Sequence, residues 1–339
     1  MIRRIAVSLA LALLCTACGS SPASSKKQPP SFNYPRDGEL RVDQIQLKAT
    51  HNSYHVQNPD ISNPLLAYTH APLEKQLEHQ GVRGLELDAH YDSKQGVFEV
   101  FHITLLDEGT RCRLLTDCLR TIKTWSDAHP AHHLVFIHLE PKDNPPATGT
   151  EAWFLELESE FLSVWPRDRI VTPDDVRGNV ATLREAVQSR GFPTLGETRG
   201  KILIYIDNHE TFRTMYTQGG KDVHGRLMFS DSSPSDPFAA ISVLNDPVAD
   251  QQQILDAVKQ HMIVRTRVDS EGSPLPADSG PEFDAAVSAA QIVTTDFPSA
   301  DENGGGYVFD LPGGKPSRCN PLTGPKDCTA EDVENPSFM

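Results

Sequence analysis

Short apolar runs recur along the first half of the chain, and each ends in a polar residue of a type that can act in catalysis or bind a metal. The first run, residues 45–50, alternates apolar and polar positions and leads into His51 and Asn52. A period of two predicts a β-strand. Strands that present polar side chains from their carboxyl ends are typical of (β/α) barrels, in which these ends gather on one rim. Three later runs have the same form: residues 84–90, 98–102 and 134–140.

Helical patterns separate these runs, and further strands follow. Apolar side chains have amphipathic-helix spacing in residues 64–80, 114–128, 153–164, 180–191, 251–260 and 283–290. Additional strands are predicted at residues 201–207, 226–230, 239–244, 262–267 and 291–295. Alternating strands and helices imply parallel strands joined by right-handed crossovers. We therefore expect an α/β fold, a TIM-type (β/α)8 barrel, as a single domain over residues 40–300.

The N-terminus carries an export signal. Two arginines precede an apolar run at residues 5–14, which is too short to span a bilayer, and small residues follow before Cys18. These small residues resemble a bacterial lipoprotein signal, which predicts lipidation of Cys18 and a cell-envelope lipoprotein. Cys15 stands where such signals usually have leucine, so an ordinary secretory signal stays open. We expect a signal peptide over residues 1–17 and a flexible tether over residues 18–39.

The remaining cysteines are expected to oxidise, because an exported protein meets an oxidising compartment. They are Cys112, Cys118, Cys319 and Cys328, and four cysteines allow three pairings. We expect neighbours in sequence to pair, Cys112 with Cys118 and Cys319 with Cys328. The second pair then pins a C-terminal loop or tail over residues 301–339. A zinc site is the alternative, but no Cys-x-x-Cys spacing supports it.

The net charge of the chain limits the kinds of partner that it can bind. A formal net charge of −15 argues against nucleic acid, since binding to a duplex depends on Lys and Arg that neutralise phosphates. The same charge argues against electrostatic recruitment to an anionic membrane. We expect a monomer.

The strand ends offer a set of oxygen ligands. Glu86 and Asp88 stand at i and i+2 of one strand, so their side chains share a face. Two neighbouring carboxylates repel each other, and a hard divalent cation relieves that repulsion. Asn52 and Glu140, from other strand ends, complete an all-oxygen set that suits Ca²⁺ or Mg²⁺ better than zinc. Three carboxylates in a loosely defined geometry favour Ca²⁺.

Two histidines complete the candidate site. His51 and His102 end separate predicted strands, and two imidazoles can stabilise a pentacoordinate phosphorus and protonate a leaving alkoxide. The other histidines near the predicted strand at residues 134–140 are expected to be surface or packing groups: His129, His132, His133 and His138.

These residues resemble a known family, the phosphoinositide-specific phospholipases C, particularly its bacterial calcium-dependent branch. The similarity is carried by residues 50–54, 84–88, 101–102 and 139–142, and weaker similarity continues to about residue 298. The resemblance implies a TIM-type barrel and His51 and His102 as catalytic histidines. It also implies four calcium ligands, namely Asn52, Glu86, Asp88 and Glu140.

The resemblance further implies a reaction at a membrane surface. In this family the inositol 2-hydroxyl attacks the phosphodiester phosphorus, which releases diacylglycerol and inositol 1,2-cyclic phosphate. By analogy His51 contacts the phosphoryl oxygens, His102 protonates the leaving oxygen, and Glu86 is the leading candidate for the base. Lys142 and Arg265 are candidate contacts to the phosphatidylinositol headgroup, and for each a structural ion pair is the alternative.

One departure from the family and two rival functions remain. Eukaryotic members hold ring phosphates with lysines on the strand that matches residues 201–207, where this chain has Tyr205 and Asp207, so unphosphorylated phosphatidylinositol is the expected headgroup. A glycerophosphodiester phosphodiesterase is one rival. The corresponding motif of that family begins His-Arg-Gly, whereas this chain has His51-Asn52-Ser53 at that place. A non-catalytic surface binding barrel is the other, although it would not need two histidines beside a metal site.

Overall fold

The computed structural model describes residues 33–208, 210–269, 280–300 and 306–337. Residues Tyr34–Met339 form one compact unit. The predicted signal peptide, the predicted lipidation site Cys18 and most of the tether lie outside the described residues. In the described part of the chain, no helix is long and apolar enough to cross a membrane.

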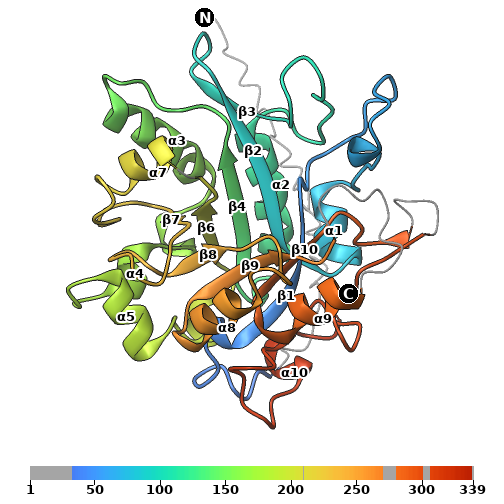
Figure 1. Ribbon diagram of the computed structural model, residues 1–339, viewed down its shortest axis with the longest axis vertical. Helices are drawn as coiled ribbons and strands as arrows, with labels where there is room; N and C mark the ends of the chain where they lie inside the picture. Colours follow the sequence, from blue (N-terminus) through green and yellow to red (C-terminus); the bar gives the residue numbers. More distant parts are fainter. Residues whose placement is uncertain (1–32, 209, 270–279, 301–305, 338–339) are drawn as a thin grey trace, which may run out of the picture. The chain divides into compact units, whose positions relative to one another are not determined.

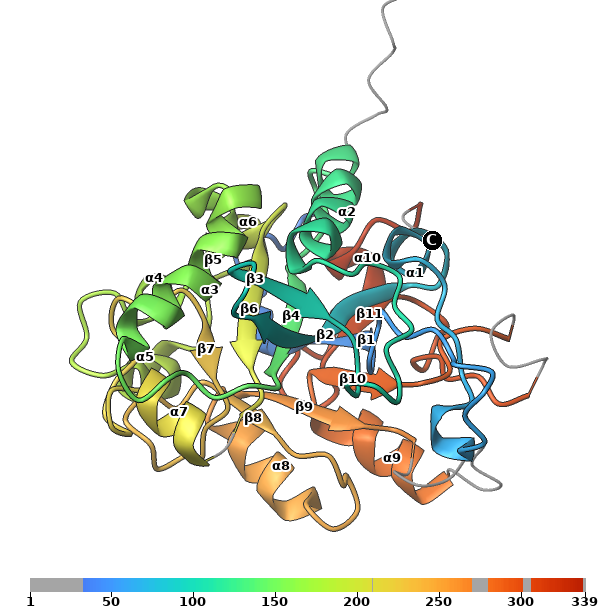
Figure 2. The same ribbon diagram turned by 90° about the horizontal axis from the view of Figure 1, so that it is seen from above.

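Parallel strands form the centre of the compact unit. Within the described residues the barrel strands are β1 (Ile45–Thr50), β2 (Val82–Asp92), β4 (Val135–Pro141), β6 (Ile202–Ile206), β7 (Phe229–Ser230), β8 (Ile241–Val243), β9 (Ile263–Arg267) and β10 (Ile292–Thr295). From β1 the sheet runs through β2, β4 and β6 to β7 in one direction, and through β10 and β9 to β8 in the other. A parallel bridge between Asp231 and Ile241 joins the two ends. The expected TIM-type barrel is confirmed (Figure 2).

Helices cover the outside of the barrel, as α8 and α9 cover β8 and β9 (Figures 1 and 2). The helices are α1 (Leu73–His79), α2 (Leu115–Ala128), α3 (Thr150–Val164), α4 (Pro173–Arg177), α5 (Leu183–Arg190), α6 (Leu195–Thr198), α7 (Glu210–Tyr216), α8 (Gln251–Lys259), α9 (Gly280–Ala289) and α10 (Ala330–Val333). The prediction of one helix over residues 64–80 is wrong. Pro72 immediately precedes α1, and proline disfavours helical backbone in the residue before it.

The strand predicted at residues 98–102 is a second correction. β3 (Val97–Val100) pairs antiparallel with the outer part of β2, with Val100 opposite Ala89 and Val97 opposite Asp92. Only a tight turn separates β2 from β3, and a parallel crossover needs about a dozen residues or more. The segment is therefore the return strand of a hairpin that extends β2 beyond the rim. Because it runs backwards, it still delivers His102 to the rim.

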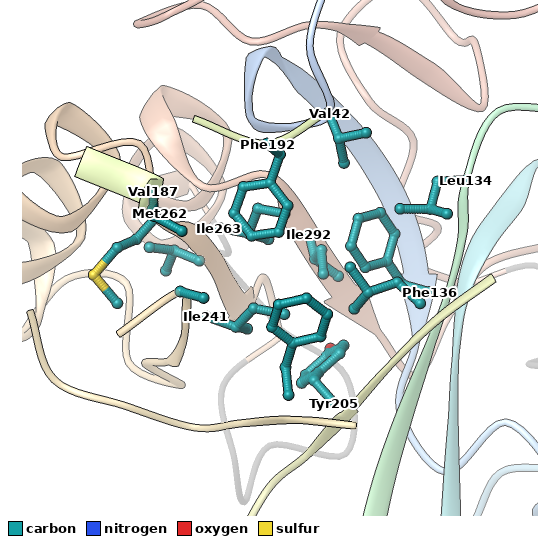
Figure 3. Packing of buried hydrophobic residues seen from close by; sticks show 14 of the residues in the cluster. Val42, Leu134, Phe136, Val187, Phe192, Tyr205, Ile241, Met262, Ile263 and Ile292 are labelled. Atoms are coloured by element: carbon teal, nitrogen blue, oxygen red, sulfur yellow. The ribbon is translucent and has the colours of Figure 1, made fainter. Parts of the chain in front are cut away.

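Alternation along the strands determines which side chains face inward. In β4, Phe136 belongs to the cluster inside the barrel, whereas Val135 and Ile137 pack with the helices outside. Phe136 and Tyr205 point into the interior together with Ile263 (Figure 3). Continuing each strand by steps of two from this apolar layer leads to the polar rim.

The C-terminal segment packs at the opposite end of the barrel. β11 (Ser317–Cys319) pairs antiparallel with Ile45–Leu47, the amino-terminal half of β1. Arg83 and Glu334 form a buried ion pair of 2.8 Å. Both expected disulfides are confirmed: Cys112 with Cys118 and Cys319 with Cys328.

Candidate active site

Three carboxylates converge at the carboxyl end of the barrel. Strand register places Glu86 beside His138 and Asp88 beside Glu140. Because the side chains of a strand alternate, Glu86 and Asp88 both point inward from β2, and Glu140 does so from β4. One carboxylate oxygen of each lies within 4.8 Å of the others. The structure thus brings together the three acidic residues that the sequence singled out.

The Asp88 carboxylate has the surroundings of a cation ligand. Among the described residues, neither of its buried oxygens accepts a hydrogen bond of ordinary geometry. Asp88 forms an ion pair with Lys142, whose Nζ lies 2.8 Å from Asp88 Oδ2. Burial and the neighbouring Glu140 raise the pKa of Asp88 well above its usual range. A buried carboxylate in this position gains from a divalent cation, and oxygen-only donors fit Ca²⁺.

Asn52 lies beside this cluster. It follows β1 with a left-handed backbone, φ 44°, a conformation that asparagine tolerates better than most residues. Its Oδ1 accepts a hydrogen bond from the Tyr54 hydroxyl at 3.1 Å, and its Nδ2 donates to the Tyr68 hydroxyl at 3.1 Å. The next residue, Ser53, is bound to the backbone of Glu86: Ser53 N–H donates to Glu86 O at 3.1 Å, and Glu86 N–H donates to Ser53 Oγ at 2.8 Å. The amide oxygen can therefore serve the same ion.

Glu86 is surrounded by positive or protonatable groups. Arg265 Nη2 lies 2.7 Å and His138 Nδ1 3.2 Å from Oε2, and His51 Nε2 lies 3.8 Å from Oε1. Burial alone would raise the pKa of Glu86, but His138, His51 and Arg265 hold it well below its usual range. A carboxylate held anionic in this way is a good cation ligand and a weak proton acceptor.

His51 has an aspartate partner that the sequence analysis missed. Its Nδ1 lies 2.7 Å from Asp296 Oδ1, and Asp296 also pairs with Arg267 at 2.9 Å. Burial opposes ionisation of Asp296, but His51 and Arg267 outweigh it and lower its pKa to about 2. With Nδ1–H donating to an anionic Asp296, the lone pair of Nε2 faces Glu86 and the site.

His102 is oriented in a similar way by Asp107. Its Nδ1 lies 2.9 Å from Asp107 Oδ2, and the fully buried His55 contacts the same carboxylate through Nε2, also at 2.9 Å. The side chain of His102 is partly exposed, whereas Asp107 is buried. Nδ1 of His102 is thereby occupied by a carboxylate, as Nδ1 of His51 is.

His138 contradicts our expectation for the histidines of its region. It lies on the inner face of β4, with Nδ1 3.2 Å from Glu86 and Nε2 3.3 Å from Asp207. Burial would lower its pKa, but Glu86 and Asp207 raise it to about 9. Its ring also stacks on Tyr205, with centroids 4.8 Å apart. His138 is a cationic support of the site, whereas His132 and His133 are buried packing groups, as expected.

An open polar cavity of about 470 Å³ lies over this rim. His51, Glu86 and Glu140 line it, together with the two candidate headgroup contacts Lys142 and Arg265. Further lining residues are Pro141, Asp143, Asn144, Asp207, Asn208, Thr211, Asn245 and Arg267. The lining combines cations with carboxylates and amides, so the cavity is polar.

The sequence matches the family described as "Phosphoinositide phospholipase C, Ca2+-dependent" over residues 40–99 and 94–321. Among curated proteins, none matches the chain.

Solved structures with the same fold include bacterial enzymes. A calcium-dependent phosphoinositol-specific phospholipase C from Pseudomonas sp. is 17% identical, with a TM-score of 0.61, over 86% of this chain and 100% of that one. A Ca²⁺-dependent phosphatidylinositol-specific phospholipase C from Streptomyces antibioticus is also 17% identical, with a TM-score of 0.59, over 77% of this chain and 96% of that one.

Proposed function

The chain belongs to the Ca²⁺-dependent phosphoinositide phospholipase C family, and on this premise we propose that it cleaves phosphatidylinositol into diacylglycerol and inositol 1,2-cyclic phosphate. One observation carries the proposal. His51 and His102 each have an aspartate on Nδ1, and His51 lies next to a cluster of three carboxylates. Internal phosphoryl transfer needs a proton acceptor, a proton donor and positive charge beside phosphorus.

Asn52, Glu86, Asp88 and Glu140 would hold the calcium ion. Bound there, Ca²⁺ supplies positive charge that lowers the pKa of a bound hydroxyl and stabilises anionic phosphate oxygens. The low pKa of Glu86 keeps that ligand ionised. It also leads us to assign the base to another residue.

His51 is the proton acceptor in this proposal. Asp296 holds the proton on Nδ1, so Nε2 accepts the proton of the inositol 2-hydroxyl as its oxygen bonds to phosphorus. His102 then donates its Nε2 proton to the glyceryl oxygen as the bond from that oxygen to phosphorus breaks. Exchange with water returns both histidines to their starting states. This assignment replaces phosphoryl binding as the main role of His51.

Charges in the cavity favour a headgroup without ring phosphates. Arg265 lines the cavity but is already paired with Glu86 at 2.7 Å. Asp207 also lines the cavity and carries a lowered pKa, because burial, which opposes ionisation, is outweighed by His138. An anionic Asp207 repels an added phosphate on the ring. Unphosphorylated phosphatidylinositol therefore remains our proposed substrate.

An exposed apolar loop supports action at a lipid surface. Directly after His102, the side chains of Ile103, Leu105 and Leu106 are 39%, 94% and 45% exposed. Neighbouring exposed apolar side chains are unusual on a soluble surface and mark contact sites. With a net charge of −15, apolar insertion is a better route to a membrane than electrostatic attraction. We also propose export, with Cys18 as the lipid anchor.

The proposal is tested by supplying the purified protein with vesicles that contain phosphatidylinositol and, separately, with a water-soluble glycerophosphodiester. Diacylglycerol release from the vesicles with calcium, and its loss in H51A and H102A, supports the proposal. Release of glycerol phosphate from the soluble diester alone would assign the protein to the rival phosphodiesterase activity.

A further inference from the structure

Lys142 lies between two of the three clustered carboxylates. It is the first residue after β4. Its backbone N–H donates to Ala89 O at 2.8 Å, which holds the backbone of Lys142 beside β2. Its Nζ lies 2.8 Å from Asp88 Oδ2 and 2.6 Å from Glu140 Oε1. Glu86, the third carboxylate, has Arg265 and His138 as partners instead. One ammonium thus neutralises the part of the cluster that those residues do not reach.

We propose that Lys142 is an internal counter-ion that competes with calcium for Asp88 and Glu140 and moves to the substrate phosphate when calcium binds. The inference rests on the proposed function, since it takes the acidic cluster as the calcium site and the adjoining cavity as the phosphate site.

Lys142 is suited to the first position by charge. Asp88 is buried and receives no hydrogen bond of ordinary geometry from the described residues, so without a metal ion the Lys142 ammonium is its charge partner. At 2.8 Å from Asp88 Oδ2 and 2.6 Å from Glu140 Oε1, the Lys142 Nζ contacts both carboxylates at once. One ammonium therefore bridges the two carboxylates.

Lys142 is suited to the second position by its reach. Its side chain is 21% exposed and lines the cavity, and a lysine stem is long and flexible. A calcium ion and an ammonium on the same carboxylate oxygens repel each other, so the ammonium must leave. The cavity beside it is where the phosphate enters, and a phosphate oxygen offers the displaced ammonium a new partner.

Two consequences follow from this exchange. Calcium binding costs the loss of two ion pairs, so Lys142 weakens calcium affinity in the absence of substrate. Phosphate binding recovers part of that loss, so calcium and headgroup each strengthen the binding of the other, and by the same factor. The two roles that the sequence left open for Lys142, balancing Glu140 or touching phosphate, become two states of one side chain.

The test compares the wild-type chain with K142M by calorimetric titration of calcium. K94M is the matched control, because Lys94 is exposed on the turn between β2 and β3 and its replacement removes the same charge. We expect K142M to bind calcium about tenfold or more tightly than wild type, within the usual range of coupling between sites, and K94M to stay within about twofold. Inositol 1-phosphate should tighten calcium binding more in wild type than in K142M.

A second readout follows the side chain itself. Labelling with an amine-reactive reagent, quantified by mass spectrometry, should find Lys142 protected without calcium and more reactive with it, while Lys94 does not change. Wild type that binds calcium no more weakly than K142M, with Lys142 equally reactive in both states, would overturn the inference and leave the proposed function standing. Wild type that binds no calcium at all would overturn both.

Discussion

Replacing Asp296 with asparagine separates the positioning of the base from the binding of the metal. Asp296 Oδ1 lies 2.7 Å from His51 Nδ1. In D296N the amide group retains the shape but can donate to Nδ1, which moves the imidazole proton to Nε2 and removes the lone pair that faces the substrate. The equivalent change in a serine protease triad lowers kcat by about 10⁴, and general base catalysis contributes about 10²–10⁴ in rate. We therefore expect kcat to fall by about 10³.

The assay is initial-rate release of inositol phosphate from phosphatidylinositol vesicles at saturating calcium, together with calorimetric calcium titration. D143N is the matched control, because Asp143 also lines the cavity, and its side chain accepts a hydrogen bond from the Tyr91 backbone at 2.7 Å. Calcium affinity should change less than about threefold in both variants, since neither residue is a proposed ligand. A D296N protein that keeps more than about a tenth of wild-type kcat would refute the assignment of His51 as base.

Three further predictions concern the surroundings of the site. The pKa of His138 is raised from 6.5 to about 9, so its contribution to stability is complete below pH 6.5 and is lost as the pH rises to about 9. Urea unfolding of the calcium-free wild type should show this loss as a fall in the free energy of unfolding of at most about 3 kcal/mol. In H138Q the free energy of unfolding should change less over the same pH range. Leu105 is 94% exposed, so L105S should reduce sedimentation with phosphatidylinositol vesicles several-fold while turnover of a soluble headgroup substrate is unchanged; equal sedimentation would exclude the loop as a membrane contact. D207N should raise the rate on a ring-phosphorylated headgroup, relative to the rate on phosphatidylinositol, by up to about tenfold, because it removes one like charge. An unchanged ratio of the two rates would show that Asp207 does not select the headgroup.

Strand periodicity made much of the site predictable from sequence. Glu86 and Asp88 share a face because they are two residues apart in one strand, and Glu140 lies opposite Asp88 in the register of the next barrel strand. The parallel barrel follows from the same alternation of strands and helices. The same rule also contained a signal that we did not use: His138 stands two residues before Glu140, and therefore on the inner face of β4.

The missed aspartates depend on contacts between distant parts of the chain. Asp296 meets His51 because β10 lies beside β1, with Thr50 opposite Thr295. This pairing of the first and last barrel strands brings together two residues that are 245 positions apart. Asp107 lies in a loop without periodicity, so no pattern marks it as the partner of His102. The hairpin of β2 and β3 could not be predicted for a different reason. The pattern of β3 is that of a barrel strand, and only its direction differs.

Phosphorus NMR of the purified protein with phosphatidylinositol micelles tests the central claim most directly. We predict the signal of a five-membered cyclic inositol phosphate when calcium is present, and no turnover once a chelator is in excess. This result would establish the internal nucleophile and the metal requirement together. Turnover that persists in the chelator, or a first product without the cyclic phosphate signal, would contradict the account.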